Sequence, residues 1–244
     1  MELIVIASSS KGNSYILDSG NSILLIEVGV SYKTKILPGC GHRRKDIVGC
    51  LVTHHHNDHA SHISELRENG IKCYTPSDLE GIHHRQEYVE IGGGFGYMAL
   101  KMVHTNGDCS PCECWAFLIH HKDSGWILFC TDTAYIPQDI SLFELSHVLI
   151  AANYSKDILV SNVKDGTINM RRAKHTIKGH MSIERCIKEL SMMNLTKCHT
   201  ITLLHLSESN SAADEFKTMI EREFGIQCDI AESGLMVDCS KEPF

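Results

Sequence analysis

The chain has 244 residues, 43% of them hydrophobic, and a formal net charge of −7. This length and composition fit one globular domain with a sizeable core, which we expect to span residues 1–244. No apolar run is long enough to cross a bilayer, and no basic, apolar leader opens the chain, so we expect a cytoplasmic protein with no membrane partner. The eleven scattered cysteines are an odd number and favour reduced thiols over a disulfide framework.

Apolar runs and helical spacing predict two groups of strands, each followed by helices. In chain order, the pattern predicts strands over Leu3–Ala7, Tyr15–Leu17, Ser22–Glu27 and Val48–Thr53, a helix over His59–Asn69, strands over Tyr97–His104, Trp115–His120, Trp126–Thr131 and His147–Ala152, a helix over Ser182–Met193, a strand over His199–His205, a helix over Ser211–Phe224, and a last strand over Gln227–Ala231. The economical arrangement is an α/β fold, an αββα four-layer sandwich in which two mixed sheets face each other with helices outside.

The segment His54–His59 carries the strongest chemical signal. It follows an apolar, strand-like run and has the pattern H-x-H-x-D-H, so four metal-binding side chains fall within six residues. Residues two apart on an extended segment point to the same side, so His54 and His56 can hold one ion. Asp58 and His59 lie where the chain must turn and can reach a second ion, and two ions roughly 3.5–4 Å apart are the usual apparatus for hydrolysing a phosphodiester or an amide. The alternative is a polar loop that happens to be rich in histidine.

Three further candidate ligands, His104, Asp132 and His205, each close an apolar, strand-like segment. A side chain at the end of a strand is held rigidly, which suits a site that needs fixed coordination. One histidine after a strand means little, but the same position recurs at all three. The sequence therefore predicts that these side chains complete a two-metal site.

The ligand set resembles the ordered motifs of the metallo-β-lactamase superfamily over nearly the whole chain; its members are His54, His56, Asp58, His59, His104, Asp132 and His205. Four segments resemble the YycJ/WalJ branch, and more closely small phage-type relatives of it: Ser8–Ser14, Thr131–Thr133, Gly179–Ser182 and Leu204–Ser207. The resemblance implies a first metal held by His54, His56 and His104. It implies a second metal held by Asp58, His59 and His205, with Asp132 as the bridge. Zinc is the expected metal of both sites, and manganese is the alternative.

The same resemblance bears on the activity. Asp132 argues against a lactamase, where that position is usually cysteine. Proteins of this branch act on phosphodiesters, and similar phage proteins of the anti-Pycsar family cleave cyclic nucleotides. Asp58 is expected to ligate a metal, to orient the attacking water, or to do both.

His180 is a catalytic candidate outside the ligand set. It immediately precedes a predicted helix, and a helix N-terminus favours anions. A histidine there can donate to a phosphoryl oxygen or protonate the leaving alkoxide, and proteins similar to RNase Z and YycJ have a histidine in a similar place. The alternative is a capping or packing role.

Two positions depart from the family pattern. Glu27 stands where many members carry aspartate, so it keeps the charge and supports the metal loop from a different angle. Ala151 stands where relatives often have a glutamate, two residues before the Asn153–Tyr154 pair. If that glutamate orients the acid histidine in the relatives, its absence here weakens the case for proton donation by His180. It does not affect the predicted metal ligands.

Charge bears on the substrate. A protein that grips a long duplex neutralises several phosphates with Lys and Arg, but the chain is acidic and its densest basic cluster, His42–Lys45, is short. Arg171 and Arg172 are expected on a solvated face, although either can meet a phosphate. The sequence therefore predicts a dinuclear-metal phosphodiesterase for small nucleotide-type diesters such as cyclic mononucleotides. The alternatives are a YycJ-like DNA or RNA exonuclease or endonuclease, another ester or thioester hydrolase, and a non-catalytic metal-binding module; a homodimer is left open.

Overall fold

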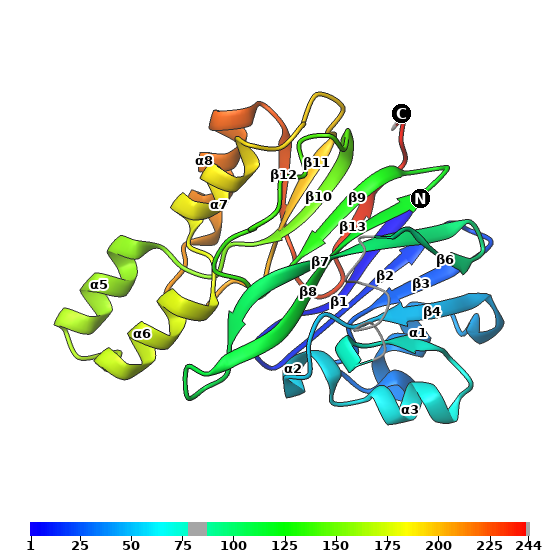
Figure 1. Cartoon of the computed structure of the whole chain (residues 1–244), viewed down its shortest axis with the longest axis horizontal. Coiled ribbons are helices and arrows are strands. Elements are labelled where there is room, and N and C mark those ends of the chain that lie inside the picture. The colour runs from blue at the N-terminus through cyan, green and yellow to red at the C-terminus, as the bar shows by residue number, and fades with distance from the viewer. Residues whose placement is uncertain (78–86, 243–244) are drawn as a thin grey trace.

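Two β-sheets lie face to face and helices cover their outer surfaces in the computed structural model, which describes residues 1–77 and 87–242 (Figure 1). Central strands such as β10 (Leu145–Ala151) are buried along their whole length. A strand buried on both faces needs cover from both sides, and here the other sheet and a layer of helices supply it. The αββα sandwich predicted from the sequence is confirmed.

The first sheet has the strand order β13-β1-β2-β3-β4-β5. Its strands are β1 (Glu2–Ser9), β2 (Gly12–Asp18), β3 (Ile23–Ile26), β4 (Ile47–Leu51), β5 (Cys73–Tyr74) and β13 (Met236–Asp238). β3, β4 and β5 run parallel, whereas β13, β1, β2 and β3 pair antiparallel. The sheet is therefore mixed.

The second sheet has the order β12-β11-β10-β9-β8-β7-β6. Its other strands are β6 (Val89–Gly92), β7 (Phe95–Thr105), β8 (Pro111–His121), β9 (Gly125–Cys130), β11 (Thr200–Leu204) and β12 (Gln227–Ile230). β9 to β12 run parallel, and β6 to β9 pair antiparallel. The parallel half of this sheet carries two of the predicted ligands at its strand ends.

Helices lie on both outer faces, and one pair of them projects beyond the sheets. The first sheet is covered by the π-helix η1 (Tyr32–Ile36), α1 (Leu37–Gly39), the 3-10 turn η2 (Arg44–Asp46), α2 (Asn57–Ala60) and α3 (Ile63–Glu68). The second sheet is covered by α7 (Ile183–Leu190) and α8 (Ala213–Phe224). The projecting pair is α5 (Lys156–Lys164) and α6 (Met170–Gly179), which lie side by side at the left of Figure 1.

The main core fills the space between the sheets. Tyr15 of the first sheet packs edge-on against Phe129 of the second, with ring centroids 5.2 Å apart. Leu51 and Phe117 are fully buried in the same cluster. Each such side chain contributes about 1.5–3 kcal/mol when buried, so the two sheets stabilise one another and hold the loops at their edges in place.

The predicted helix over His59–Asn69 is wrong in one respect, because it is two helices. α2 ends at Ala60 and α3 begins at Ile63. Between them, the backbone N–H of His62 donates to the carbonyl of Val28 instead of continuing the helix. The periodic spacing predicts the helical segments but carries no information on this tertiary hydrogen bond.

The sequence pattern does not predict α5 and α6, nor the short strands β5, β6 and β13. α6 has charged or polar side chains around most of its surface and buries only Ala173 and Gly179, so it lacks the apolar stripe on which helix prediction depends. None of the helices in the described ranges has both the length and the apolar character needed to cross a membrane.

Candidate metal centre

The loop after β4 brings His54 and His56 together as the sequence predicts. His56 is extended, with φ −63° and ψ 148°, and forms the N-cap of α2. The rings of His54 and His56 lie edge to face with their centroids 4.5 Å apart. Asp58 and His59 follow inside the short helix α2, so the turn predicted at this point turns them toward a different part of the site.

Glycine at position 29 allows this loop to lie close to the first sheet. A Cβ atom at Gly29 would lie 1.8 Å from the carbonyl oxygen of Asp58. Any larger residue would push α2 away from the β3–η1 connection and move the side chains that it carries.

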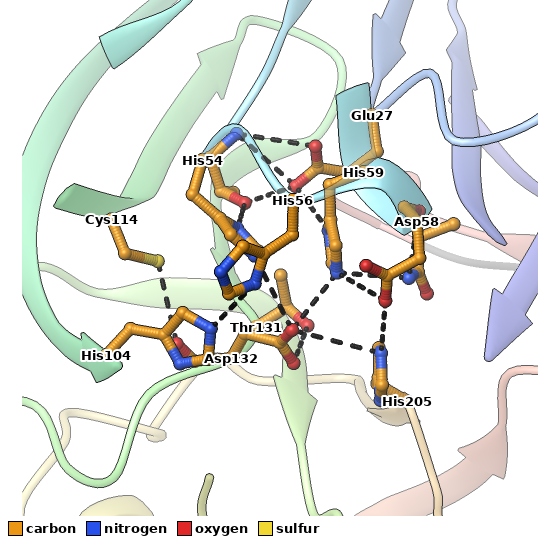
Figure 2. A network of polar contacts seen from close by, with 12 residues as sticks. Glu27, His54, His56, Asp58, His59, His104, Cys114, Thr131, Asp132 and His205 are labelled. Carbon is orange, nitrogen blue, oxygen red and sulfur yellow. Dashed lines mark hydrogen bonds and ion pairs between the residues drawn. The ribbon is translucent and has the colours of Figure 1, made fainter. Parts of the chain in front are cut away.

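The seven predicted ligands gather into two neighbouring groups (Figure 2). The first group is His54, His56 and His104, and the second is Asp58, His59, Asp132 and His205. Within each group, the candidate ligand atoms lie within 4.8 Å of one another. They come from the β4–α2 loop, the end of β7, and the residues that follow β9 and β11, so elements of both sheets build one site.

Asp132 lies between the two groups. Its Oδ2 is 3.1 Å from Nε2 of His59, 3.7 Å from Nε2 of His54 and 3.9 Å from Nε2 of His205. On the far side, Oδ2 of Asp58 is 3.3 Å from Nε2 of His59 and 3.2 Å from Nε2 of His205. A carboxylate in this position can reach an ion in either group.

Each imidazole has one nitrogen directed into the site and the other engaged by a neighbouring residue. The engaging contacts are Thr53 Oγ1 with His54 Nδ1 at 2.8 Å, Asn106 Oδ1 with His56 Nε2 at 3.2 Å, Glu27 Oε1 with His59 Nδ1 at 3.3 Å, the Gly179 carbonyl with His104 Nδ1 at 2.7 Å, and Asn153 Nδ2 with His205 Nδ1 at 3.1 Å. Histidines that bind metals are typically held in this manner through the nitrogen that does not ligate, which fixes ring orientation.

The arrangement fits divalent metal ions. Nε2 of His54 is fully buried, points into the cluster and has no hydrogen-bond partner. A buried polar nitrogen without a partner is destabilising, and an ion at the centre of the first group would supply that partner. Imidazole nitrogen and carboxylate oxygen are ligands that zinc, manganese and iron share.

Burial and charge set the protonation of the two groups differently. Burial, assisted by the charge of nearby His59, holds the pKa of His54 well below its usual range, and burial lowers the pKa of His104 to about 4. Both are therefore neutral at pH 7, the form that binds metals. Burial opposes protonation of His59 and His205, but the surrounding carboxylates outweigh it and raise the pKa of both. The second group is therefore a site that favours positive charge.

Three residues of the centre have left-handed backbone, at Glu27 (φ 62°), Asp132 (φ 44°) and His205 (φ 52°). Each comes immediately or shortly after a strand, β3, β9 or β11. The left-handed turn directs the side chain back toward the space between the sheets. For a residue other than glycine, this conformation costs about 1–2 kcal/mol, which the contacts of the site must offset.

His180 lies at the edge of the centre, but on a different element from the one expected. It is the C-cap of α6, and α7 begins only after Ser182, whose side chain accepts a hydrogen bond from the N–H of Arg185. The helix that the sequence predicts after His180 is present, but His180 lies two residues before its N-cap and at the carbonyl end of α6, so its position by itself does not support an anion site. Nδ1 of His180 lies 3.5 Å from Oδ1 of Asp132 and has no hydrogen-bond partner.

A cavity of about 370 Å³ opens beside this histidine. It is lined by Ser10, Asn153, Arg172, His175, Thr176, His180, His205 and the segment 206–210. His205 and His180 face it from the metal centre, and Arg172 and His175 face it from α6. A molecule in this cavity would contact the centre on one side and a basic helix on the other.

Two residues of the centre, Asn13 and Glu27, lie outside the ligand set predicted from the sequence. Asn13 is fully buried, and its Nδ2 is 3.1 Å from Nε2 of His59 and donates to the carbonyls of Ser9 and Asp58. It lies in the opening segment Ser8–Ser14, so that motif was the available signal. Glu27 was noted only as a departure from the family pattern, although its carboxylate accepts from Thr53 Oγ1 at 2.5 Å and lies beside His59.

The fold and the ligand cluster define a metal-dependent hydrolase with its site at the edge of two facing sheets. Residues 10–121 match the family described as the Metallo-beta-lactamase superfamily. The chain is 26% identical over 232 residues to exodeoxyribonuclease WalJ of Streptococcus pneumoniae (strain D39 / NCTC 7466), an alignment that covers 78% of this chain and 85% of that protein. It is 23% identical over 232 residues to exodeoxyribonuclease YycJ of Bacillus anthracis, with coverage of 79% and 87%.

The architecture also matches solved structures. The metallo-beta-lactamase fold protein YhfI from Bacillus subtilis superposes with a TM-score of 0.71 at 17% identity, over 97% of this chain and 99% of that one. The chain therefore has the metallo-β-lactamase fold, and its residues 10–121 carry the match to that superfamily, as its motifs imply. The resemblance to the YycJ/WalJ branch is confirmed, and the narrower likeness to phage proteins stays a prediction.

Proposed function

We propose that the protein is a dinuclear-metal nuclease that hydrolyses DNA from a strand end. The observation that carries the proposal is the position of Asp132 between two ligand groups, together with a cavity that His205 and His180 share with Arg172 of α6. Two relatives that align with most of the chain are named exodeoxyribonucleases. The acidic net charge favoured a small diester, but net charge is a poor guide here because four exposed cations lie together on α6, whose last residue is hydrogen-bonded to His104 of the centre.

In this proposal the ligand roles follow the two groups. His54, His56 and His104 would hold the first ion, Asp58, His59 and His205 would hold the second, and Asp132 would serve both. Zinc is the proposed metal because the sites are rich in imidazole, and manganese is the alternative. Bound divalent ions supply Lewis acidity and lower the pKa of water to near neutrality.

Two side chains, Asp58 and His180, then act on the attacking water and on the leaving oxygen. Burial works against the charge on Asp58, but hydrogen bonds from His205 and His59 hold the pKa of Asp58 far below its usual range. Its carboxylate is ionised at neutral pH and orients the attacking water by accepting a hydrogen bond from it, while the proton of that water, acidified by a bound ion, would pass to solvent as the new P–O bond forms. His180, on the cavity side of Asp132, donates a proton to the leaving oxygen as the old P–O bond breaks.

A cyclic mononucleotide is the second candidate substrate. The cavity of about 370 Å³ is within the range that binds small ligands, roughly 300–1,000 Å³. We further propose that residues 1–244 act as one domain in the cytoplasm, supported by the core shared between the sheets and by the eleven free thiols. A homodimer stays a prediction.

A substrate panel tests the proposal. The protein is loaded with zinc or manganese and incubated with end-labelled single- and double-stranded DNA, RNA of the same sequence, cyclic mononucleotides and bis(p-nitrophenyl) phosphate, with Asp132→Ala as the control for the metal centre. We expect mononucleotide release from DNA ends that a chelator abolishes and that the Asp132→Ala variant lacks. Turnover of a cyclic nucleotide without any cleavage of DNA would contradict the nuclease proposal and support the second candidate substrate.

A further inference from the structure

We propose that α6 is the surface that holds the DNA strand leading away from the metal centre, through phosphate contacts made by Arg171, Arg172, Lys174 and Lys178. The inference rests on the proposed nuclease function and adds to it the residues that grip the substrate outside the centre. It also names a chemical class of ligand for α6, a chain of phosphodiesters, which a single cyclic diester does not offer.

The first observation is the charge on this helix. Within Met170–Gly179, four side chains are cationic and none is acidic. All four cations are exposed, and in the described part of the chain none of them lies within 4.0 Å of a carboxylate. Arg171, Lys174 and Lys178 have the spacing i, i+3, i+7, so they lie on one face of the helix. Unpaired cations along one face form an anion-binding strip on a protein whose net charge is −7.

The second observation is that α6 connects this strip to the centre. Arg172 and His175 line the cavity that His180 and His205 also line. Arg172 and His175 line a second hollow as well, of about 230 Å³, together with Gly107, Asn169 and Arg171. The two hollows share Arg172 and His175, so they adjoin along α6, one beside the metal centre and the other beside the exposed Arg171.

The third observation is that α6 is fixed relative to the ligands. The carbonyl of Gly179, its last residue, accepts a hydrogen bond of 2.7 Å from His104 Nδ1. A Cβ atom at Gly179 would lie 2.7 Å from Oγ1 of Thr105 and 3.3 Å from His104 Nδ1, so only glycine lets the helix approach this closely. At the other end, the side chain of Asn169 caps the helix by accepting from the N–H of Arg172. A phosphate held by α6 is therefore held at a set position with respect to the metals.

The dimensions of the strip suit a nucleic acid backbone. From Arg171 to Lys178 the helix rises by about 10 Å, at roughly 1.5 Å per residue. Successive phosphates of one strand in B-DNA rise by about 3.4 Å, so the strip can face about three of them. Arg172, with its planar fork of donors, is placed to contact the phosphate nearest the centre.

The acids that face this path do not remove its charge. Glu208 lines the cavity, but its carboxylate is paired with Lys11 at 2.7 Å. Asp108 on the β7–β8 loop lies near Arg171 and is hydrogen-bonded to the N–H and hydroxyl of Ser110. One exposed carboxylate beside four cations leaves the strip positive.

The test compares a strip variant with a matched variant elsewhere. The strip variant is Arg171→Ala, Lys174→Ala and Lys178→Ala, and the control is Lys33→Ala, Lys35→Ala and Lys45→Ala, three exposed lysines on η1 and η2 that likewise make no ion pair in the described ranges. Circular dichroism and metal content establish that both variants fold and hold metal. Zinc-loaded proteins are then titrated with a fluorescent, phosphorothioate single-stranded 20-mer over a salt series.

We expect the strip variant to bind the 20-mer on the order of 10- to 100-fold more weakly at 0.1 M salt, with the slope of log K against log salt reduced by about 2, since each contact to a single strand contributes about 0.7. The ratio of kcat/KM for the 20-mer to that for a dinucleotide should fall by a similar factor. The control should match the wild type in binding, slope and ratio.

Two outcomes separate this inference from the proposed function. If the wild type cleaves DNA but the strip variant binds the 20-mer as tightly and with the same salt slope as the control, α6 does not hold the strand and the inference is overturned. If the wild type neither binds the 20-mer nor cleaves DNA, the nuclease proposal fails, and the inference fails with it. If the wild type cleaves DNA and the strip variant, but not the control variant, binds the 20-mer more weakly, both the nuclease proposal and the inference on α6 are supported.

Discussion

The substitution Glu27→Gln tests whether a carboxylate that touches no ion controls the affinity of the metal centre. Glu27 is fully buried at the end of β3. Its Oε1 accepts from Thr53 Oγ1 at 2.5 Å and lies 3.3 Å from Nδ1 of His59. Thr53 in turn contacts Nδ1 of His54 at 2.8 Å, so one carboxylate positions a histidine in each of the two groups.

The magnitude follows from the loss of charge. Glutamine keeps an accepting oxygen and nearly the same volume, but the bonds it accepts are no longer charge-assisted. A hydrogen bond to a charged group contributes about 1.5–3 kcal/mol, against about 0.5–1.5 kcal/mol for a neutral one. The difference of about 1–2 kcal/mol corresponds to metal affinity lower by roughly 5- to 30-fold, at about 1.4 kcal/mol per factor of ten. This agrees with the range of about 10- to 100-fold for residues that support metal ligands.

Competition with a chromophoric chelator measures the affinity, and elemental analysis measures the number of ions bound. Glu65→Gln is the matched control, because Glu65 also holds a loop through several bonds, to the N–H groups of Tyr32 and Lys33 and to His62, yet contacts none of the candidate ligands. We expect the Glu27 variant to lose affinity and the Glu65 variant to keep it. Equal affinities for wild type and the Glu27 variant, or equal losses in both variants, would refute the reasoning.

Two further predictions concern a catalytic and a structural histidine. His180→Ala should retain both metals and lower turnover of DNA by about 10²–10⁴-fold, the range for a lost proton donor, while hydrolysis of bis(p-nitrophenyl) phosphate, which has a good leaving group, falls much less; equal losses on both substrates would contradict the proton-donor role. His147 is buried with bonds to Thr200 Oγ1 and the Ser240 carbonyl, and burial lowers its pKa to about 4, so the unfolded chain binds this proton more tightly and acid favours unfolding. Between pH 6.5 and 5 the wild type should lose about 1.5 kcal/mol of unfolding free energy relative to His147→Gln, measured by urea denaturation, and parallel pH profiles would show that His147 does not titrate in this range.

The ligand set could be predicted from the sequence because its spacing is local and its strands are apolar. His54, His56, Asp58 and His59 are close in the chain, so their spacing predicts metal binding before any fold is known. His104, Asp132 and His205 each follow a run of buried residues, and the order of those runs already placed them at strand ends. The roles of these residues as ligands stay predictions that metal analysis must test.

The supporting residues could not be predicted in this way, because they depend on register between strands. β3 and β4 pair in parallel with Ile26 opposite Leu51, and this register brings Glu27 beside Thr53. Likewise, nothing in the spacing of Arg171, Arg172, Lys174 and Lys178 shows that they border the centre. The hydrogen bond between Gly179 and His104, a contact between distant parts of the chain, brings the end of that helix to the site.

The left-handed backbone at Asp132 and His205 has a consequence for protein engineering. Glycine at either position would relieve steric strain while deleting a candidate ligand, so the two changes that most simply stabilise these turns are also expected to inactivate the enzyme. Laboratory evolution that selects survivors of heating, without a catalytic screen, will therefore drift toward inactive proteins at these codons. The same bias acts on any lineage whose substrate disappears, and glycine at these two positions would mark a homologue that has been released from selection for hydrolysis.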